Sequence, residues 1–159
     1  IGEALVNYFI ENDAVVYGVD YQETQLAIMS KRINSSVFYP VPMDFTSQDC
    51  LKYIEAIQPD ILIHGASLKM TNFCEDFADY YYSKNVLQTK VFLESILPFV
   101  KERVIFISSD EAYKPHNQFG KQKLEVEWQM PFRGVLLGGG STSFCFLIMG
   151  VVTQGFAFS

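Results

Sequence analysis

The stretch PDILIHGASLK, residues 59–69, decides the fold class of this chain. Pro59 and Asp60 form a turn signal, and ILIH at 61–64 is a short apolar, β-branched run. Such a run, bounded by turn residues, predicts a strand that is buried on both faces. The small residues at 65–67 follow it directly, and small residues allow another backbone or a ligand to approach closely.

Outward from this strand, short apolar runs alternate with segments of helical periodicity. Further strands are predicted at 14–19, 36–41 and 104–108, and helices at 3–11, 22–33, 47–57, 77–99 and from 121 to 128. Ser47 is the expected cap of the third helix, and the long fourth helix should break near Pro98. This alternation predicts an α/β fold, a Rossmann-like doubly wound parallel sheet with ligands at the carboxyl ends of its strands.

Composition limits the classes of function. The chain has 159 residues, of which 49% are hydrophobic and 19% charged, as in ordinary globular domains. Its net charge of −6 argues against a nucleic-acid surface, because phosphate backbones bind to clustered Lys and Arg. A nucleotide is still compatible, since backbone amides at a helix start bind phosphate.

The cysteines and the apolar runs indicate the compartment. Cys50, Cys74 and Cys145 are far apart and have no metal-ligand spacing, which favours reduced thiols and predicts no metal site. The longest apolar run, at 144–152, is well short of the ~20 residues that a membrane span needs. We therefore expect a cytoplasmic protein without a membrane span.

The two ends of the chain define the expected domain limits. Residues 1–130 are predicted to be a partial dinucleotide-binding domain that lacks its first strand, which would leave the neighbouring strands with unpaired edges. Residues 131–159 contain one charged side chain, Arg133, and a Gly run at 138–140. This tail is either a sixth strand near 134–137 with its loop or a segment outside the native reading frame. No substrate domain follows, so we expect a part of a longer protein.

Four segments, in order, resemble the extended short-chain dehydrogenase/reductase superfamily. The first is Ile1-Gly2 at a helix start, with Asp20 at the end of the next strand. In the family the loop reads GxxGxxG, and Gly2 corresponds to its last glycine. The resemblance implies that pyrophosphate binds at this helix start and that Asp20 binds the adenosine ribose hydroxyls, which favours NAD over NADP.

The second and third segments add further cofactor residues. Asp44-Phe45 stands where the family has a carboxylate near the adenine amino group, and PDILIHGASLK resembles the family's PDxVxHAAAxK. The resemblance assigns Gly65, Ala66 and Ser67 to the cofactor, whereas His64 is expected to be a packed structural residue. The sequence SKNVLQT also fits the family's TNVxGT and assigns Asn85 to the cofactor site.

The fourth segment, FISSDEAYKPHNQFGKQK at 106–123, carries the strongest resemblance. The polysaccharide-biosynthesis sugar dehydratases read FISTDKAxxPxNxMGxxK here. The adjacent Asp110 and Glu111 are instead similar to the acid and base of the dTDP-glucose 4,6-dehydratases. Neighbouring carboxylates repel, which favours one protonated group beside one ionised group.

The superfamily's YxxxK motif is incomplete. Lys123 matches its lysine, which holds the nicotinamide ribose, but Phe119 stands where tyrosine is expected and has no proton to exchange. Part of the polysaccharide branch has methionine at this position. Ser109 and Tyr113 are alternative sources of a hydroxyl group.

The resemblance implies an NAD-dependent nucleotide-sugar 4,6-dehydratase, a lyase that acts on a UDP- or dTDP-sugar and is homo-oligomeric when full length. The expected catalytic residues are Ser109, Asp110, Glu111 and Lys123. A nucleotide-sugar epimerase or 4-keto reductase of the same fold is the first alternative. A non-catalytic NAD-binding homologue is the second.

Overall fold

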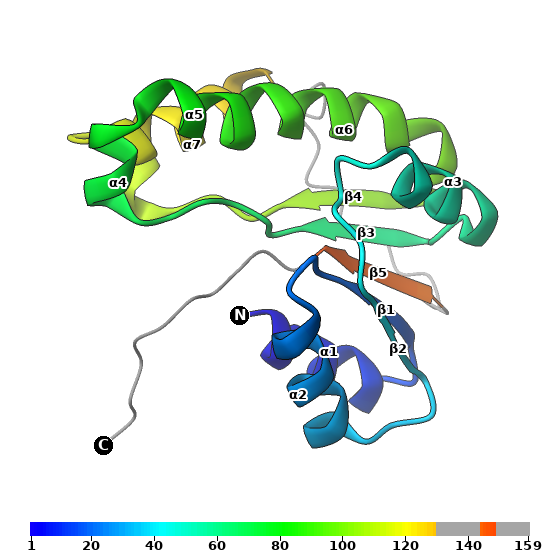
Figure 1. The fold of residues 1–159 in the computed structure, drawn as a ribbon. Coiled ribbons are helices and arrows are strands. Elements are labelled where there is room, and N and C mark those ends of the chain that lie inside the picture. Colours follow the sequence, from blue (N-terminus) through cyan, green and yellow to red (C-terminus); the bar gives the residue numbers. More distant parts are fainter. Residues whose placement is uncertain (130–143, 149–159) are drawn as a thin grey trace.

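The computed structural model describes residues 1–129 and 144–148, which form a five-stranded parallel sheet between two layers of helices (Figure 1). The strand order is β2-β1-β5-β3-β4. The strands are β1 (Val15–Val19), β2 (Phe38–Val41), β3 (Ile61–His64), β4 (Arg103–Phe106) and β5 (Phe144–Ile148). All neighbouring strands run parallel, which confirms the doubly wound α/β fold.

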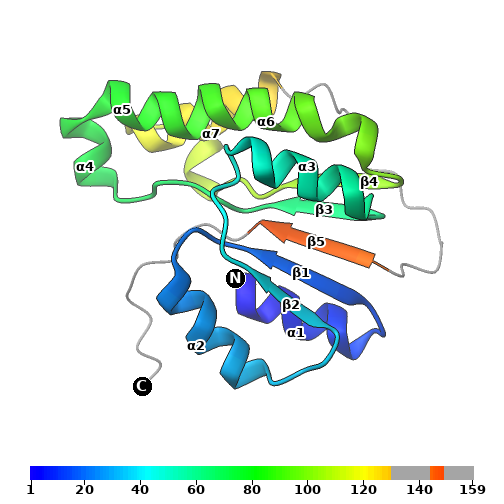
Figure 2. The ribbon, with the colours of Figure 1, turned by 45° about the vertical axis from the view of Figure 1, so that its right-hand side comes forward.

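The helices divide between the two faces of the sheet. Helices α1 and α2 cover one face, and α3 to α7 lie on the other (Figures 1 and 2). The helices are α1 (Gly2–Glu11), α2 (Glu23–Ile33), α3 (Gln48–Ile57), α4 (Thr71–Asp76), α5 (Ala78–Tyr82), α6 (Thr89–Ile96) and α7 (Gln118–Gln129), with the π-helical segment η1 (Ser83–Gln88) and the 3-10 turns η2 (Leu97–Phe99) and η3 (Asp110–Ala112).

Local sequence signals set several of these boundaries. The Ser47 side chain accepts a hydrogen bond of 3.1 Å from the Cys50 backbone N–H and so caps α3, as predicted. Asn34 and Gln58 end α2 and α3 in the left-handed conformation, with φ of 43° and 49°. The predicted strand 61–64 coincides with β3.

Each face of the sheet has its own apolar core. Val6, Val16 and Leu26 belong to the core beneath α1 and α2, whereas Ile54, Leu62 and Phe92 belong to the core beneath α3 and α6. The buried residue of α1 is Val6, whereas Ala4 and Tyr8 are exposed. Apolar residues surround most of this helix, so tertiary packing decides which side is buried.

The helix predicted at 77–99 is present, but it is divided into several segments. It consists of α5, η1 and α6, and Pro98 lies in the 3-10 turn η2 that follows α6. The short helix α4 precedes it and was not predicted. The π-helical segment in its middle is notable because such segments are rare and concentrate at functional sites.

The expectation of unpaired edges beside a missing central strand is wrong. Strand β5 lies between β1 and β3 and pairs in parallel with both. Phe144 is the partner of Val15 in β1, and Ile148 is the partner of His64 in β3. Free backbone N–H and C=O groups of two facing strand edges bind an extended segment that reaches them in register. The strand predicted near 134–137 lies outside the described residues.

Candidate functional site

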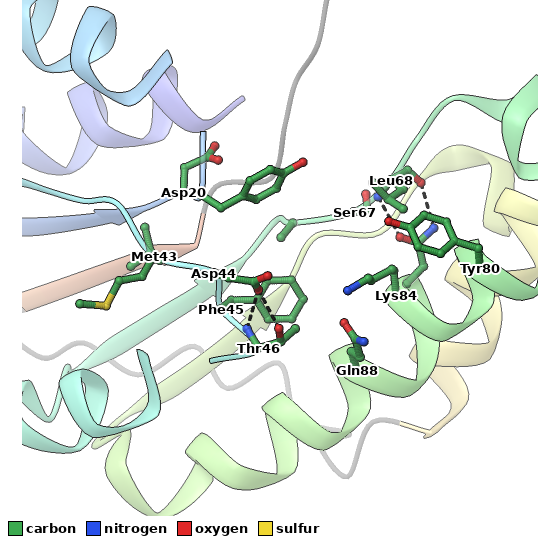
Figure 3. A pocket seen from close by; sticks show the side chains of 14 residues that line it. Asp20, Met43, Asp44, Phe45, Thr46, Ser67, Leu68, Tyr80, Lys84 and Gln88 are labelled. Atoms are coloured by element: carbon green, nitrogen blue, oxygen red, sulfur yellow. Dashed lines mark hydrogen bonds between the residues drawn. The ribbon is translucent and has the colours of Figure 1, made fainter. Parts of the chain in front are cut away.

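A cavity of about 230 Å³ opens where β1, β2 and β3 end at the carboxyl edge of the sheet. Six predicted cofactor residues line it together: Asp20, Asp44, Phe45, Ala66, Ser67 and Asn85 (Figure 3). We call this space the edge cavity. Parallel doubly wound sheets bind ligands in such crevices, because the helices on the two sides diverge there.

Asp20 follows β1 and is 8% exposed. Burial raises the pKa of this carboxyl group, and a hydrogen bond of 2.9 Å from the Gln22 backbone N–H partly offsets the increase. Asp20 also borders a second hollow beside the start of α1, where Gly2 lies. The carboxylate therefore stands between the helix start and the edge cavity.

Asp44 and Phe45 form another part of the wall. The Asp44 Oδ1 atom accepts hydrogen bonds of 2.8 Å from both the backbone N–H and the hydroxyl of Thr46. The Phe45 ring packs edge-on against His64, with 4.9 Å between the ring centres. These contacts fix the turn after β2 and leave the Asp44 Oδ2 atom without a hydrogen bond to any of the described residues.

The loop after β3 is held by Asn85. Its side chain accepts a hydrogen bond from the Leu68 N–H and donates one to the Leu68 C=O, both of 2.8 Å. It also donates to Gln122 Oε1 on α7 at 3.0 Å. Asn85 thus positions the loop that carries Ala66 and Ser67, and a direct contact with cofactor stays a prediction. Gly65 does not line the cavity.

The long helix supplies cavity residues that the sequence interpretation missed. Tyr80, Lys84 and Gln88 project from α5 and η1 toward the ends of β2 and β3 (Figure 3). Their spacing of four residues was a readable signal, because positions i, i+4 and i+8 share one helical face. Thr46, Tyr21 and Met43 are further lining residues that were not predicted.

A second group of predicted residues lies between β4 and α7, and we call it the β4–α7 site. Ser109 caps η3 by accepting a hydrogen bond of 3.3 Å from the Glu111 N–H, and its hydroxyl donates to Asp110 Oδ1 at 3.2 Å. Asn117 Nδ2 donates to Glu111 Oε2, and Asn117 Oδ1 accepts from the Gly120 N–H at 2.7 Å. The two neighbouring carboxylates therefore have different partners.

Gly120 is required by the close approach of α7 to η3. A Cβ atom at this position would lie 2.5 Å from the Glu111 carbonyl oxygen and 3.2 Å from the Pro115 Cβ. The absence of a side chain at Gly120 thus allows the turn that bears Glu111 to rest on the helix.

Lys123 is buried at the base of the β4–α7 site. Its ammonium donates to the Ile107 carbonyl at 3.0 Å and lies 4.7 Å from the Phe106 ring centre and 5.7 Å from that of Phe119. Burial lowers the pKa of Lys123 to about 8, and Glu127 acts in the opposite direction.

Phe119, at the position of the missing tyrosine, is a buried phenyl ring and offers no hydroxyl group. Phe119 is buried with Cys74 and Tyr81, and Tyr113 is 83% exposed. His64 is fully buried beside Phe92 and Phe106, as predicted for a packed histidine. Burial, together with Lys123, lowers the pKa of His64 to about 3, so this ring is neutral.

The structure thus gathers the predicted residues into two groups. Ser109, Asp110, Glu111 and Lys123 do not line the edge cavity, and Gly2 lies in the adjoining hollow. Within residues 1–129 and 144–148, no helix is long and apolar enough to cross a membrane. The same residues contain no cluster of His, Cys, Asp and Glu suited to a metal ion.

Comparison with known proteins identifies related chains. The model of the polysaccharide biosynthesis protein family matches residues 1–154. An uncharacterized membrane protein of Methanocaldococcus jannaschii is 30% identical over 129 residues, which are 80% of this chain and 38% of that protein.

Solved structures show the same fold. UDP-glucuronic acid 4-epimerase from Bacillus cereus, solved with UDP-glucuronic acid and NAD, gives a TM-score of 0.69 at 22% identity, over 81% of this chain and 47% of the epimerase. The UDP-Glc/GlcNAc 4-epimerase from Campylobacter jejuni gives 0.68 at 18% identity, over 90% of this chain and 48% of that enzyme. The chain therefore spans less than half the length of these relatives.

Proposed function

This chain belongs to the polysaccharide biosynthesis protein family, and we propose that it forms the NAD-binding half of a nucleotide-sugar 4,6-dehydratase. The observation that carries this proposal is the adjacent pair Asp110 and Glu111, held by separate partners on a turn that packs against α7. The full-length protein would act on a UDP- or dTDP-sugar in the synthesis of a surface polysaccharide or another glycan.

The edge cavity has the groups that NAD requires. Asp20 and Asp44 offer carboxylate oxygens to the ribose hydroxyls and to the adenine amino group, and the small residues Ala66 and Ser67 leave room for the dinucleotide. The Bacillus cereus relative, whose fold this chain shares, was solved with NAD. Bound NAD supplies hydride removal from C4 of the sugar and hydride return at C6.

Three side chains of the β4–α7 site can together move the protons. Ser109 is the hydroxyl nearest to the acid on this turn, and it takes the proton of the C4 hydroxyl while its own proton passes to Asp110. Asp110 then protonates the departing C6 hydroxyl, which leaves as water. Glu111 removes the C5 proton and later returns it to the same carbon, so the product is a 4-keto-6-deoxy sugar and all protons balance.

Lys123 contributes a positive charge beside this chemistry. Its burial and its contact with the Ile107 carbonyl hold the ammonium in one place, as needed to orient the nicotinamide ribose. Since Phe119 offers no hydroxyl, the route through Ser109 replaces the usual tyrosine in this proposal.

The direct test incubates the full-length protein with UDP-N-acetylglucosamine and, separately, dTDP-glucose. We expect a 4-keto-6-deoxy product from one of them. Inversion at C4 without loss of water would instead indicate the epimerase alternative. NAD binding without any product would indicate the non-catalytic homologue.

The residue assignment has its own test. Asp110→Asn and Glu111→Gln should each slow elimination by about 10²- to 10⁴-fold, the usual contribution of a positioned acid or base, and should leave NAD affinity unchanged. Glu102→Gln, which neutralises an exposed carboxylate before β4, is the matched control. Unchanged elimination in either active-site variant would refute the assigned roles.

A further inference from the structure

The π-helical segment η1 forms the wall of the edge cavity opposite the turn of Asp44 and Phe45 (Figure 3). Together with Thr89 it reads SKNVLQT, which keeps the asparagine of the TNVxGT pattern but has Lys84 in place of threonine and Gln88 in place of glycine. Both replaced positions line the cavity. The two departures from the pattern therefore add polar side chains to the ligand side of the helix.

Gln88 has unused hydrogen-bonding capacity at this wall. Its Oε1 atom is shielded from solvent and has no hydrogen-bond partner among the residues that the structure describes. A buried acceptor without a donor is unfavourable, so a ligand that supplies a donor gains affinity here. The terminal amide torsion of glutamine is soft, and a rotation about it exchanges the positions of the acceptor and donor atoms at the cavity wall.

We propose that Gln88 recognises the adenine base of the bound dinucleotide. A carboxamide presents an acceptor beside a donor, and the 6-amino group of adenine next to a ring nitrogen presents the complementary pair. Gln88 Oε1 accepts from the 6-amino group, and Gln88 Nε2 donates to the adjacent ring nitrogen. This inference rests on the proposed binding of NAD and adds a residue that binds its base.

Asp44 makes the arrangement selective. Its Oδ1 atom is occupied by Thr46, whereas its Oδ2 atom is available to the cavity. The 6-amino group has two hydrogens, one for Asp44 and one for Gln88. Hypoxanthine has a carbonyl oxygen at this position, which would face the Asp44 carboxylate, whereas the Gln88 amide can rotate to donate to it. The cavity should therefore distinguish an adenine dinucleotide from its deaminated analogue.

The test compares the affinities of the full-length protein for NAD and for nicotinamide hypoxanthine dinucleotide by calorimetry. The wild type should prefer NAD. Gln88→Leu, which keeps the size of the side chain but removes its polar atoms, should weaken the binding of both dinucleotides by about tenfold, as for the loss of one good base contact. Gln88→Glu has acceptors only and should also weaken both, while the preference for NAD that Asp44 sets should remain in both variants.

Leu87→Ala is the control, because this exposed neighbour on η1 does not line the edge cavity. A Gln88→Leu or Gln88→Glu variant with unchanged affinity for NAD would overturn the role of Gln88. A wild type that binds both dinucleotides equally would overturn the role of Asp44. Failure of the wild type to bind either dinucleotide would refute the NAD site itself, whereas NAD binding without sugar product refutes only the dehydratase.

Discussion

The edge cavity and the β4–α7 site lie at the same end of the sheet but use their polar groups differently. In the edge cavity, Asp44 and Gln88 keep atoms that have no partner among the described residues. In the β4–α7 site, Glu111 and Lys123 are held by hydrogen bonds within the protein. The first region thus has free capacity to bind a ligand, whereas the second fixes its own side chains for chemistry.

The two lysines show the same contrast. Lys84 is half-buried at the cavity wall and has no ion-pair partner among the described residues, so it remains available to a ligand. Lys123 is buried against two phenyl rings, and its charge is costly to keep there. A protein that retains a desolvated charge in this way gives up stability for function, a trade-off that stability measurements can detect.

Replacing Lys123 should have the largest effect, because it removes the buried charge that distinguishes the β4–α7 site from the edge cavity. In the folded protein Lys123 loses its proton at a pKa of about 8, whereas the unfolded chain keeps it to about 10.5. Between these pH values the unfolded state binds more protons, so this group raises the free energy of unfolding as pH increases, by roughly 3 kcal/mol in all. Lys123→Met should abolish that increase, measured by denaturant unfolding from pH 7 to 10.5.

The control for this experiment is Lys121→Met, which removes an exposed lysine from the same helix. Its unfolding free energy should follow the pH dependence of the wild type. An unchanged pH profile in Lys123→Met would show that the buried ammonium does not carry the proposed electrostatic cost.

Gly120→Ala should separate the two regions, because it disturbs the packing of the β4–α7 site and leaves the edge cavity unchanged. The new methyl group would lie 2.5 Å from the Glu111 carbonyl oxygen, and such overpacking costs up to about 3 kcal/mol. The better helix propensity of alanine returns about 1 kcal/mol. We therefore expect a loss of about 2 kcal/mol in unfolding free energy with unchanged NAD affinity.

Lys121→Ala, at the exposed neighbouring position, tests the helix contribution alone and should not destabilise the protein. If Gly120→Ala were as stable as the wild type, the close packing of α7 on η3 would be incorrect.

Local sequence features were sufficient to predict much of the fold. Strand β3 follows from its apolar, β-branched run, and the start of α3 follows from the Ser47 side chain that caps it. The gathering of Asp20, Asp44 and Ala66 also follows, because residues after parallel strands meet at one edge of the sheet.

Features that depend on distant contacts were not predictable in this way. The pairing of β5 between β1 and β3 joins segments far apart in the chain, and no local pattern specifies the partner of a strand. The π-helical geometry of η1 and its direction toward the cavity likewise depend on packing. Gln88 was therefore overlooked, although its position within a predicted helix was known.

The smallest expected effect concerns Asp20 in the edge cavity, where the charge lowers the stability of the ligand-free protein and is expected to strengthen NAD binding. Burial raises its pKa above 3.8, so the folded state holds the proton more tightly than the unfolded state, and the unfolding free energy falls as pH rises through the window above 3.8. Asp20→Asn should therefore make the ligand-free protein more stable at pH 7. It should also weaken NAD binding by about tenfold, since hydrogen bonds from the ribose to a charged acceptor are stronger than those to an amide.

Asp13→Asn removes an exposed carboxylate before β1, at a left-handed position that suits asparagine, and should change neither the stability nor the NAD affinity. Opposite changes in stability and affinity would identify Asp20 as a ligand-binding carboxylate, whereas a joint loss of both would make it a structural residue instead.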